Sequence, residues 1–318
     1  MFSMKEDIIM IRYILRRALM MIPVILAVSF VVYVLMDMAP GDIVTSLAPQ
    51  NATTEEIEMM REEMGLNDSL PVRYVRYIGN LLRGDLGVSL SLKRPVMDIF
   101  LERFPATLKL AFGSIIVAMI ISVPLGIAAA TNHRTWFDGT SMIAAMIGVS
   151  MPAFWLGLLL ILMFSLRLGW FPSGGSSGFL SIILPAVTLG AAQAGNLTRI
   201  TRSSMLEVIR QDYLRTARAK GVSERKVINR HALKNALIPI ITILGSTFGN
   251  ALGGAVVIET VFSWPGVARL TVTAINTRDM TLATGCIIMF TIFLNLTLLL
   301  VDIGYAYADP RIKAQYSK

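Results

Sequence analysis

Residues 215–240 read RTARAKGVSERKVINRHALKNALIPI, a basic stretch that runs directly into a long apolar segment. The chain around it is 54% hydrophobic and only 16% charged, with a mean hydropathy of +0.64. Soluble domains carry roughly 25% charged residues. The composition therefore predicts an integral membrane protein. The net charge of +8 does not indicate a nucleic-acid partner in a chain this apolar.

Six apolar stretches are each close to the length of about 20 residues that a membrane-spanning helix needs. Their internal prolines do not exclude helices, because neighbouring helices can satisfy the freed backbone groups. The first stretch is predicted to be a retained helix, since no small-residue cleavage site follows it. The sequence thus predicts an all-α membrane protein with six transmembrane helices. The stretches are 18–38, 107–130, 140–166, 180–198, 237–262 and 283–306.

Lys and Arg gather in the segments that six spans would place on one side of the membrane. These are the N-terminal tail, 131–139, 199–236 and the C-terminal tail. Such segments face the cytoplasm in most membrane proteins, so both termini are expected to be cytoplasmic. The expected organisation is a tail and first helix over 1–38, an extracytoplasmic cap over 39–106, a five-helix core over 107–308 and a tail over 309–318.

Segment 199–236 holds ten Lys or Arg against three Asp or Glu. Its net charge is therefore +7, compared with +8 for the whole chain. A basic loop that orients the chain and touches lipid would explain the charge alone. The residue pattern favours a folded helical structure over a simple basic loop. SMLEVIRQDYLRTARAK has helical spacing, with Met205, Val208, Ile209 and Tyr213 on one face. Gly221 suits a left-handed C-cap, and Ser223 suits the N-cap of a second helix that continues into the fifth span. A compact helical hairpin of this kind predicts a docking surface for a cytoplasmic protein.

The cap segment also carries helix signals. Thr53 and Glu56 have capping-box spacing, Gly65 can end that helix, and Pro71 can open another that runs to Arg83. Two short helices are expected here. They would form either a simple lid or a docking platform.

Five segments together resemble the permease subunit of binding-protein-dependent ABC importers for dipeptides, oligopeptides and nickel. The resemblance covers nearly the whole chain, with the segments in the family's order. They are RYIGNLLRGDLGVSLSLKRPVMDIFLERFPATLKLA, GVSMPAFWLGLLLI, DYLRTARAKGVSERKVINRHALKNALIP, IETVFSWPGVARLTVTAINTRD and the ending YADPRI.

The resemblance implies the type I ABC-importer permease fold and a set of partners. These are a second homologous permease, two ATP-binding subunits on the cytoplasmic face, an extracytoplasmic solute-binding protein and membrane lipid, with no nucleic acid. The chain has no GxxxxGK[ST] loop, so ATP hydrolysis is expected on a partner and not in this chain. The residues expected to dock the ATP-binding subunit are Tyr213, Arg215, Thr216, Ala217, Ala219, Gly221, His231 and Asn235.

Small and polar residues on the fourth and fifth spans are candidates for the pore or for helix interfaces. Glycines at four-residue spacing let helices approach closely, and this packing explains them as well as a pore does. The polar side chains could line a path or join neighbouring helices. The candidates are Gln193, Asn196, Thr242, Gly245, Thr247, Gly249, Asn250 and Gly253.

A self-contained secondary transporter or intramembrane enzyme is the alternative class. It would need a buried carboxylate near the midplane, a nucleophile elbow or inverted repeats. Glu259 and Asp302 lie near span ends and are expected to reach the membrane interface. No catalytic residue, cofactor or metal site is predicted, since the two His and the single Cys286 form no ligand cluster. Peptides are the expected substrate, with nickel, glutathione or oligosaccharides as alternatives.

Overall fold

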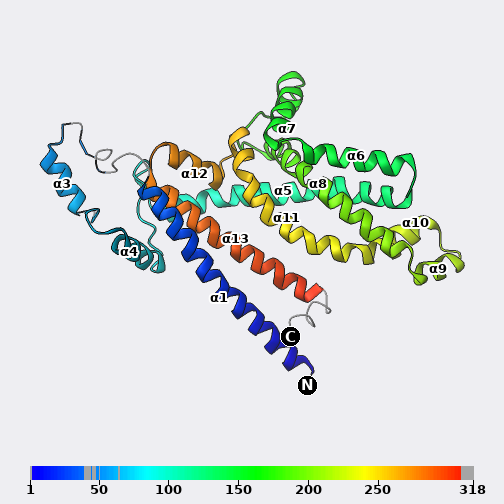
Figure 1. Ribbon diagram of the computed structural model, residues 1–318. Helices are drawn as coiled ribbons and strands as arrows, with labels where there is room; N and C mark the ends of the chain where they lie inside the picture. The colour runs from blue at the N-terminus through cyan, green and yellow to red at the C-terminus, as the bar shows by residue number, and fades with distance from the viewer. Residues whose placement is uncertain (1, 39–43, 45–47, 50, 64, 309–318) are drawn as a thin grey trace. The chain divides into compact units, whose positions relative to one another are not determined.

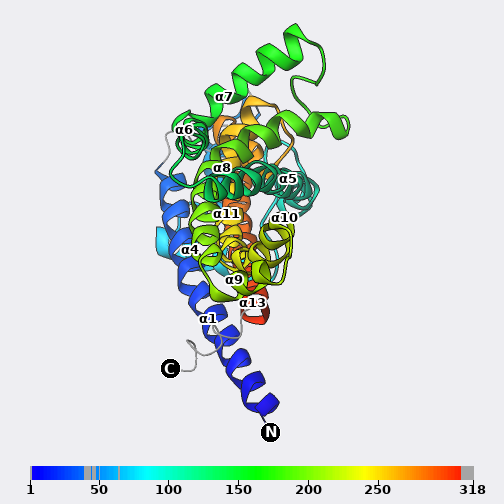
Figure 2. The same cartoon turned by 90° about the vertical axis from the view of Figure 1, so that its right-hand side faces the viewer.

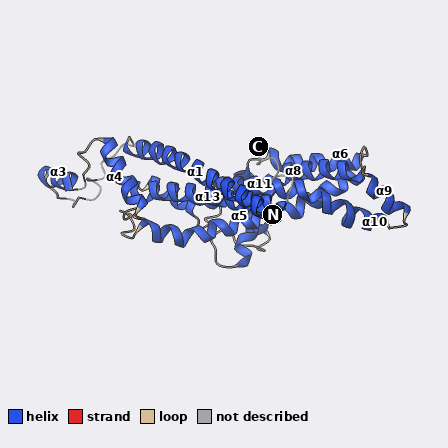
Figure 3. Ribbon diagram, turned by 90° about the horizontal axis from the view of Figure 1, so that it is seen from below, coloured by secondary structure: helices blue, strands red, loops and turns tan. Residues whose placement is uncertain are grey.

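The computed structural model describes residues 2–38, 44, 48–49, 51–63 and 65–308 (Figure 1). Within them the chain consists of helices and connecting loops, and Figure 3 shows no strand in this part. The helices are α1 Phe2–Asp37, α3 Thr54–Glu63, α4 Leu70–Leu82, α5 Val96–Thr131, α6 Trp136–Ser150, α7 Ala153–Leu160, η1 Ile161–Arg167, α8 Phe179–Ile209, α9 Asp212–Ala219, α10 Glu224–Lys226, η2 Val227–Ala232, α11 Leu233–Val261, α12 Val267–Asn276 and α13 Met280–Ala308.

Five of these helices contain segments long and apolar enough to cross a membrane. They confirm five of the six predicted spans in type and approximate position. The segments are Ile14–Leu35, Val96–Thr131, Phe179–Ile209, Pro239–Val261 and Met280–Val301.

The third predicted span, 140–166, is not one straight helix. It is a pair, α6 and then α7 with η1, bent by 98°. The bend lies at Met151 and Pro152, whose backbones are extended with ψ of 131° and 128°. Proline offers no N–H for a helical hydrogen bond and disfavours the helical conformation in the residue before it. Counted as one broken span, the pair brings the total to six.

Two compact units make up the chain, and their boundaries fall inside α1, α5 and α13 and in the loop before α12. The first comprises Met1–Ile14, Ala106–Pro265 and Thr297–Lys318, and the second comprises Leu15–Pro105 and Gly266–Leu296.

In the first unit, α8 is the central helix and packs against α6, α7 and α11. Gly195 marks a close approach, because a Cβ at this position would collide with the Ala145 carbonyl oxygen of α6. Small residues at such crossings let membrane helices come close enough for dispersion forces to hold them.

In the second unit, the predicted cap helices are present as α3 and α4. The Thr53 N–H donates to the Glu56 carboxylate at 2.7 Å, and the Glu56 N–H donates to Thr53 Oγ1 at 3.3 Å. This reciprocal pair confirms the capping box. Gly65 follows α3 with a φ of +63°, and Pro71 lies in the first turn of α4.

Asp279, just before α13, holds the loop over residues 87–95 within the second unit. Its Oδ2 accepts hydrogen bonds from Ser89 Oγ at 2.6 Å and from the backbone and hydroxyl of Ser91 at 2.9 and 2.7 Å. Its Oδ1 accepts the Leu282 N–H at 3.0 Å. Burial raises the pKa of this carboxyl, but the hydrogen bonds from the two serines and Leu282 outweigh that effect and lower it.

Candidate coupling hairpin and membrane polar groups

The basic segment folds as a compact hairpin at the end of α8. In Figures 1 and 2, α9 and α10 lie beside each other between the end of α8 and the start of α11. The chain then passes through the π-helical η2 directly into α11. The predicted continuity between the second arm and the fifth span is therefore confirmed.

The first arm differs from the prediction of one helix running to Lys220. It breaks after α8, where Gln211 is extended with φ −74° and ψ 146°. The break redirects the chain so that Leu214, and not Tyr213, is fully buried. Tyr213 is 42% exposed, and the predicted apolar face is wrong at that position. Helical periodicity extended across the break assigns Tyr213 to the face that Leu214 occupies.

Gly221 turns the hairpin with a φ of +76°. The Gly221 N–H donates to the Arg218 carbonyl at 2.9 Å, and the Val222 N–H donates to the Ala217 carbonyl at 3.2 Å. These two bonds are the Schellman pattern that satisfies the last carbonyls of a helix. The prediction of a left-handed glycine cap is confirmed. Ser223 holds the N-cap position, but its side chain makes no capping hydrogen bond.

An ion pair joins the two arms across this turn. Arg218 donates from Nε to one Glu224 oxygen at 3.0 Å and from Nη2 to the other at 2.8 Å. The hydrogen bonds from Arg218 lower the pKa of Glu224, against a smaller opposing effect of burial. Two parallel bonds fix the relative angle of the arms more tightly than one contact would.

A hydrophobic cluster lies beneath the hairpin and ties it to the ends of three long helices. Burying such a cluster removes apolar area from water and holds the arms on the helices as one body. The fully or nearly buried members are Ala130 of α5, Met205 of α8, Leu214 of α9, Val227, Ile228 and Ala232 of η2, and Ala236 of α11.

The predicted docking residues divide between surface and core. Ala217 packs partly against the buried cluster, whereas the others are exposed. Tyr213 and Asn235 come together across the hairpin, where the Asn235 amide donates to the Tyr213 hydroxyl at 2.6 Å. The remaining exposed residues are Arg215, Thr216, Ala219, Gly221 and His231.

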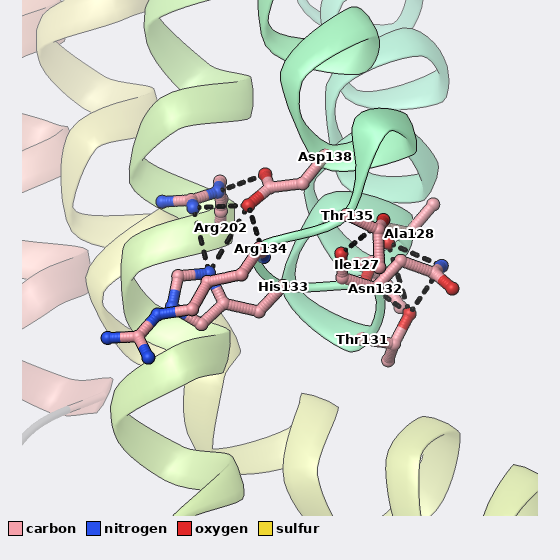
Figure 4. Close-up of polar contacts among 9 residues, drawn as sticks. All are labelled: Ile127, Ala128, Thr131, Asn132, His133, Arg134, Thr135, Asp138 and Arg202. Carbon is pink, nitrogen blue, oxygen red and sulfur yellow. Dashed lines mark hydrogen bonds and ion pairs between the residues drawn. The ribbon is translucent and has the colours of Figure 1, made fainter.

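A partly buried polar cluster, not expected from the sequence, holds the α5–α6 turn against α8 (Figure 4). Arg202 donates to both Asp138 carboxylate oxygens, at 2.7 Å each. His133 Nδ1 lies 3.2 Å from Asp138 and 3.1 Å from Arg202, and the Arg134 N–H donates to Asp138 at 3.2 Å. Arg202 is one helical turn before Met205, so the same stretch of α8 carries both the turn and the hairpin. Nothing in the local sequence links residues 64 positions apart.

The small residues predicted for the fifth span have mixed environments. Gly245 is buried, and a Cβ at Gly249 would contact Leu298 of α13. Gly253 is open, because a Cβ there would meet nothing within 4 Å. The structure therefore does not bring the three glycines to one helix interface.

The polar candidates differ in the same way. Thr247 donates to the Ile243 carbonyl of its own helix at 2.9 Å, and Asn250 is exposed. Asn196 accepts from Arg199 at 2.8 Å. Both polar atoms of the Gln193 amide are buried without a hydrogen-bond partner in the described part of the chain. The side chains of Thr242 and Asp302 lie outside the described residues.

Glu259 lies near the end of a span, as expected, but it does not reach a surface of the chain. It is fully buried near the end of α11 and accepts a hydrogen bond from Thr107 Oγ1 at 2.7 Å. One turn further on, the Trp264 indole donates to the Ala106 carbonyl at 2.8 Å. Folding brings α5 to this end of α11, which the position of Glu259 in the sequence does not reveal.

Comparison with known proteins identifies the family. Residues 122–314 match the family described as "Binding-protein-dependent transport system inner membrane component", and residues 10–111 match its N-terminal counterpart. The chain is 42% identical to the glutathione transport system permease protein GsiC of Escherichia coli O6:H1, and equally to that of Salmonella paratyphi A. Each alignment spans 304 residues, which is 96% of this chain and 99% of the relative.

Solved structures support the fold. The inward-facing MetNI methionine ABC transporter aligns with a TM-score of 0.56 at 17% identity, over 70% of this chain and 98% of the matched one. The crystal structure of an amino acid ABC transporter with histidines aligns with a TM-score of 0.50 at 14% identity. The alignment covers 68% of this chain and 94% of the matched one. With its apolar helices, its family match and its similarity to the GsiC permeases over 96% of its length, this chain is a multi-pass member of the family of inner membrane components of binding-protein-dependent transport systems.

Proposed function

We propose that this chain is the pore-forming permease subunit of an ATP-driven importer of peptides, and that the hairpin 199–236 couples it to ATP hydrolysis on a partner subunit. The partners in this proposal are a second permease, two ATP-binding subunits and an extracytoplasmic solute-binding protein. Both termini lie in the cytoplasm, and the cap 39–106 faces the binding protein.

The observation that carries the proposal is the construction of the hairpin. Gly221, the Arg218–Glu224 pair and the buried cluster make it a rigid body. Exposed side chains cover its outer surface, and its second arm runs without a break into α11. A force applied to this surface by a partner would reach a membrane helix directly, which is what coupling requires.

The Asp138–Arg202 pair extends the rigid body to a second connection. It holds the α5–α6 turn to α8 one helical turn before the cluster begins. In the proposed topology this turn is also cytoplasmic. Movement of the hairpin would then displace the ends of α5, α6, α8 and α11 together.

The relatives bear on the substrate. Their names state glutathione transport, and glutathione, an alternative to the expected dipeptides and oligopeptides, is itself a tripeptide. We therefore place glutathione first among the peptides to be tested. In this proposal the binding protein selects the substrate and the permease passes it on.

The test is the ATPase rate of the assembled complex in proteoliposomes with its binding protein. Dipeptides, longer peptides, glutathione and nickel are added in turn. Stimulation by glutathione or another short peptide, together with uptake, supports the proposal. Stimulation by nickel alone, or by none of these compounds in a complex that hydrolyses ATP, contradicts the peptide assignment.

Topology has its own test on a Cys286→Ala background. Single cysteines at Met60 and Lys220 are labelled with an impermeant reagent in sealed membranes. The two cysteines are expected to react from opposite sides of the membrane. Reaction of both from one side overturns the proposed orientation.

A further inference from the structure

The cap helix α4 has three distinct faces. Tyr74 and Tyr77 point to α1, where the Tyr74 hydroxyl donates to the Leu26 carbonyl at 3.0 Å and lies 2.8 Å from Ser29 Oγ. The Tyr74 ring meets Phe30 edge-on at 5.2 Å between centroids, and Tyr77 lies 5.4 Å from Tyr33. This face is fixed to α1.

The second face is apolar and open. Val72, Val75, Gly79 and Leu82 follow each other at three- and four-residue spacing, which places them on one side of a helix. Val75 is 69% exposed and Leu82 is 83% exposed. A Cβ on Gly79 would meet nothing within 4 Å. Such a row is costly in water and indicates a covering partner.

The third face is polar and cationic. Arg76, Asn80 and Arg83 are exposed at the same helical spacing. The Arg76 guanidinium pairs with Asp68 at the start of the helix. An open apolar face beside a cationic face is the pattern of a helix that lies in a membrane surface.

The position of α4 along α1 decides what covers the apolar face. The contacts of α4 run along α1 from Leu26 to Tyr33, and Tyr33 is only about 3 Å from Leu35, the end of the apolar segment Ile14–Leu35, at 1.5 Å per residue. Only 11% of the apolar window of α1 is buried, so the surface beside α4 is also open. A helix that packs on α1 up to this end of the segment lies at the edge of the bilayer, and the long side chain of Tyr74 reaches inward from it to Leu26.

We propose that α4 is an interfacial helix, with Val72, Val75 and Leu82 among the acyl chains of phospholipids and the arginine face at their headgroups. The tyrosines against α1 fit this level, since aromatic residues concentrate at membrane interfaces. The cap is thereby anchored to lipid through α4, while α3 remains free for a partner.

The test uses nitroxide labels on the assembled transporter in phospholipid nanodiscs, on a Cys286→Ala background. Val75→Cys and Leu82→Cys report the apolar face, and Asn80→Cys is the matched control on the same helix. Val31→Cys, an exposed position of α1, gives the value expected in lipid. Collision with oxygen, which concentrates in lipid, is compared with collision with chromium oxalate, which stays in water.

Positions 75 and 82 are expected to favour oxygen as position 31 does, and position 80 to favour chromium oxalate. If 75 and 82 favour chromium oxalate, the face is a water-exposed docking surface and the proposal is wrong. If both labels are shielded from both reagents, the face is covered by protein, which also overturns it. None of these readouts depends on substrate uptake, so a failure of this proposal would leave the proposed transport function untouched.

Discussion

Arg218 and Glu224 form a two-bonded ion pair across the turn that Gly221 makes, and the pair links the two arms of the hairpin. Their side chains are 36% and 62% exposed. Exposed pairs contribute less than about 1 kcal/mol. The pair therefore adjusts the angle between the arms, while the buried cluster and the glycine turn hold them together.

Glu224→Gln is expected to weaken association with the ATP-binding subunit by no more than a severalfold factor at neutral pH. The pKa of Glu224 is lowered in the folded state, so its contribution is present above the ordinary pKa of a glutamate and is lost as the pH falls through the folded value. The difference between variant and wild type should shrink in acid. Co-purification of the ATP-binding subunit across a pH series measures this difference. A difference between variant and wild type that grows in acid would contradict the role given to the Arg218–Glu224 pair.

Asp138→Ala is expected to lower the thermal stability of the complex. It leaves Arg202 without its carboxylate partner in a site where Asp138 is only 6% exposed. The pair is partly buried, since the Arg202 side chain is 24% exposed, and the loss of hydrogen bonds to a charged partner costs about 1.5–3 kcal/mol. Unfolding of the detergent-solubilised complex measures the loss.

Asp212→Ala is the matched control for that variant, because Asp212 is almost fully exposed and pairs with Arg215 at 3.7 Å. It should unfold at nearly the wild-type temperature. Equal stability of the Asp138→Ala and wild-type proteins would show that the cluster in Figure 4 does not hold the α5–α6 turn.

Asp279→Asn is expected to loosen the loop over residues 87–95. The asparagine keeps one acceptor oxygen but loses the charge that receives four hydrogen bonds. Since the pKa of Asp279 is lowered, the wild-type loop should stay protected above the ordinary aspartate pKa and lose protection as the pH falls through the folded value.

Hydrogen exchange of the 87–95 peptide measures this protection. The variant should exchange faster at neutral pH and show less dependence on pH than the wild type. Identical exchange in both proteins would mean that Asp279 does not anchor the loop.

Local signals in the sequence predicted the local structure well. Each of four helix signals acts on the backbone within a few residues of itself, and all four are confirmed. They are Thr53 with Glu56, Gly65, Pro71 and Gly221. Apolar length located five of the spans for the same reason.

The misses have two causes. Proline can either kink or break a membrane helix, so Pro152 alone does not predict a bend of 98°. No helix-breaking residue marks the extended Gln211. Glu259 with Thr107 and Asp138 with Arg202 are pairs joined only by folding. A single sequence carries no record of contacts between residues so far apart.

The proposed coupling role of the hairpin is tested most directly at Gly221. Its φ of +76° strains a β-branched residue, but a Cβ there would meet no neighbouring atom within 4 Å. Gly221→Val therefore perturbs the turn and not the packing, at a cost of about 1–2 kcal/mol. Gly221→Ala should be milder, and Lys220→Ala should behave nearly as wild type because its side chain is exposed.

The measurement is substrate uptake in proteoliposomes together with co-purification of the ATP-binding subunit, for Gly221→Val beside Lys220→Ala. We expect Gly221→Val to reach the membrane in normal amounts, to retain less of the ATP-binding subunit and to lose uptake, while Lys220→Ala keeps both. Wild-type retention and uptake in Gly221→Val would contradict the account, because the hairpin would then not be the coupling element.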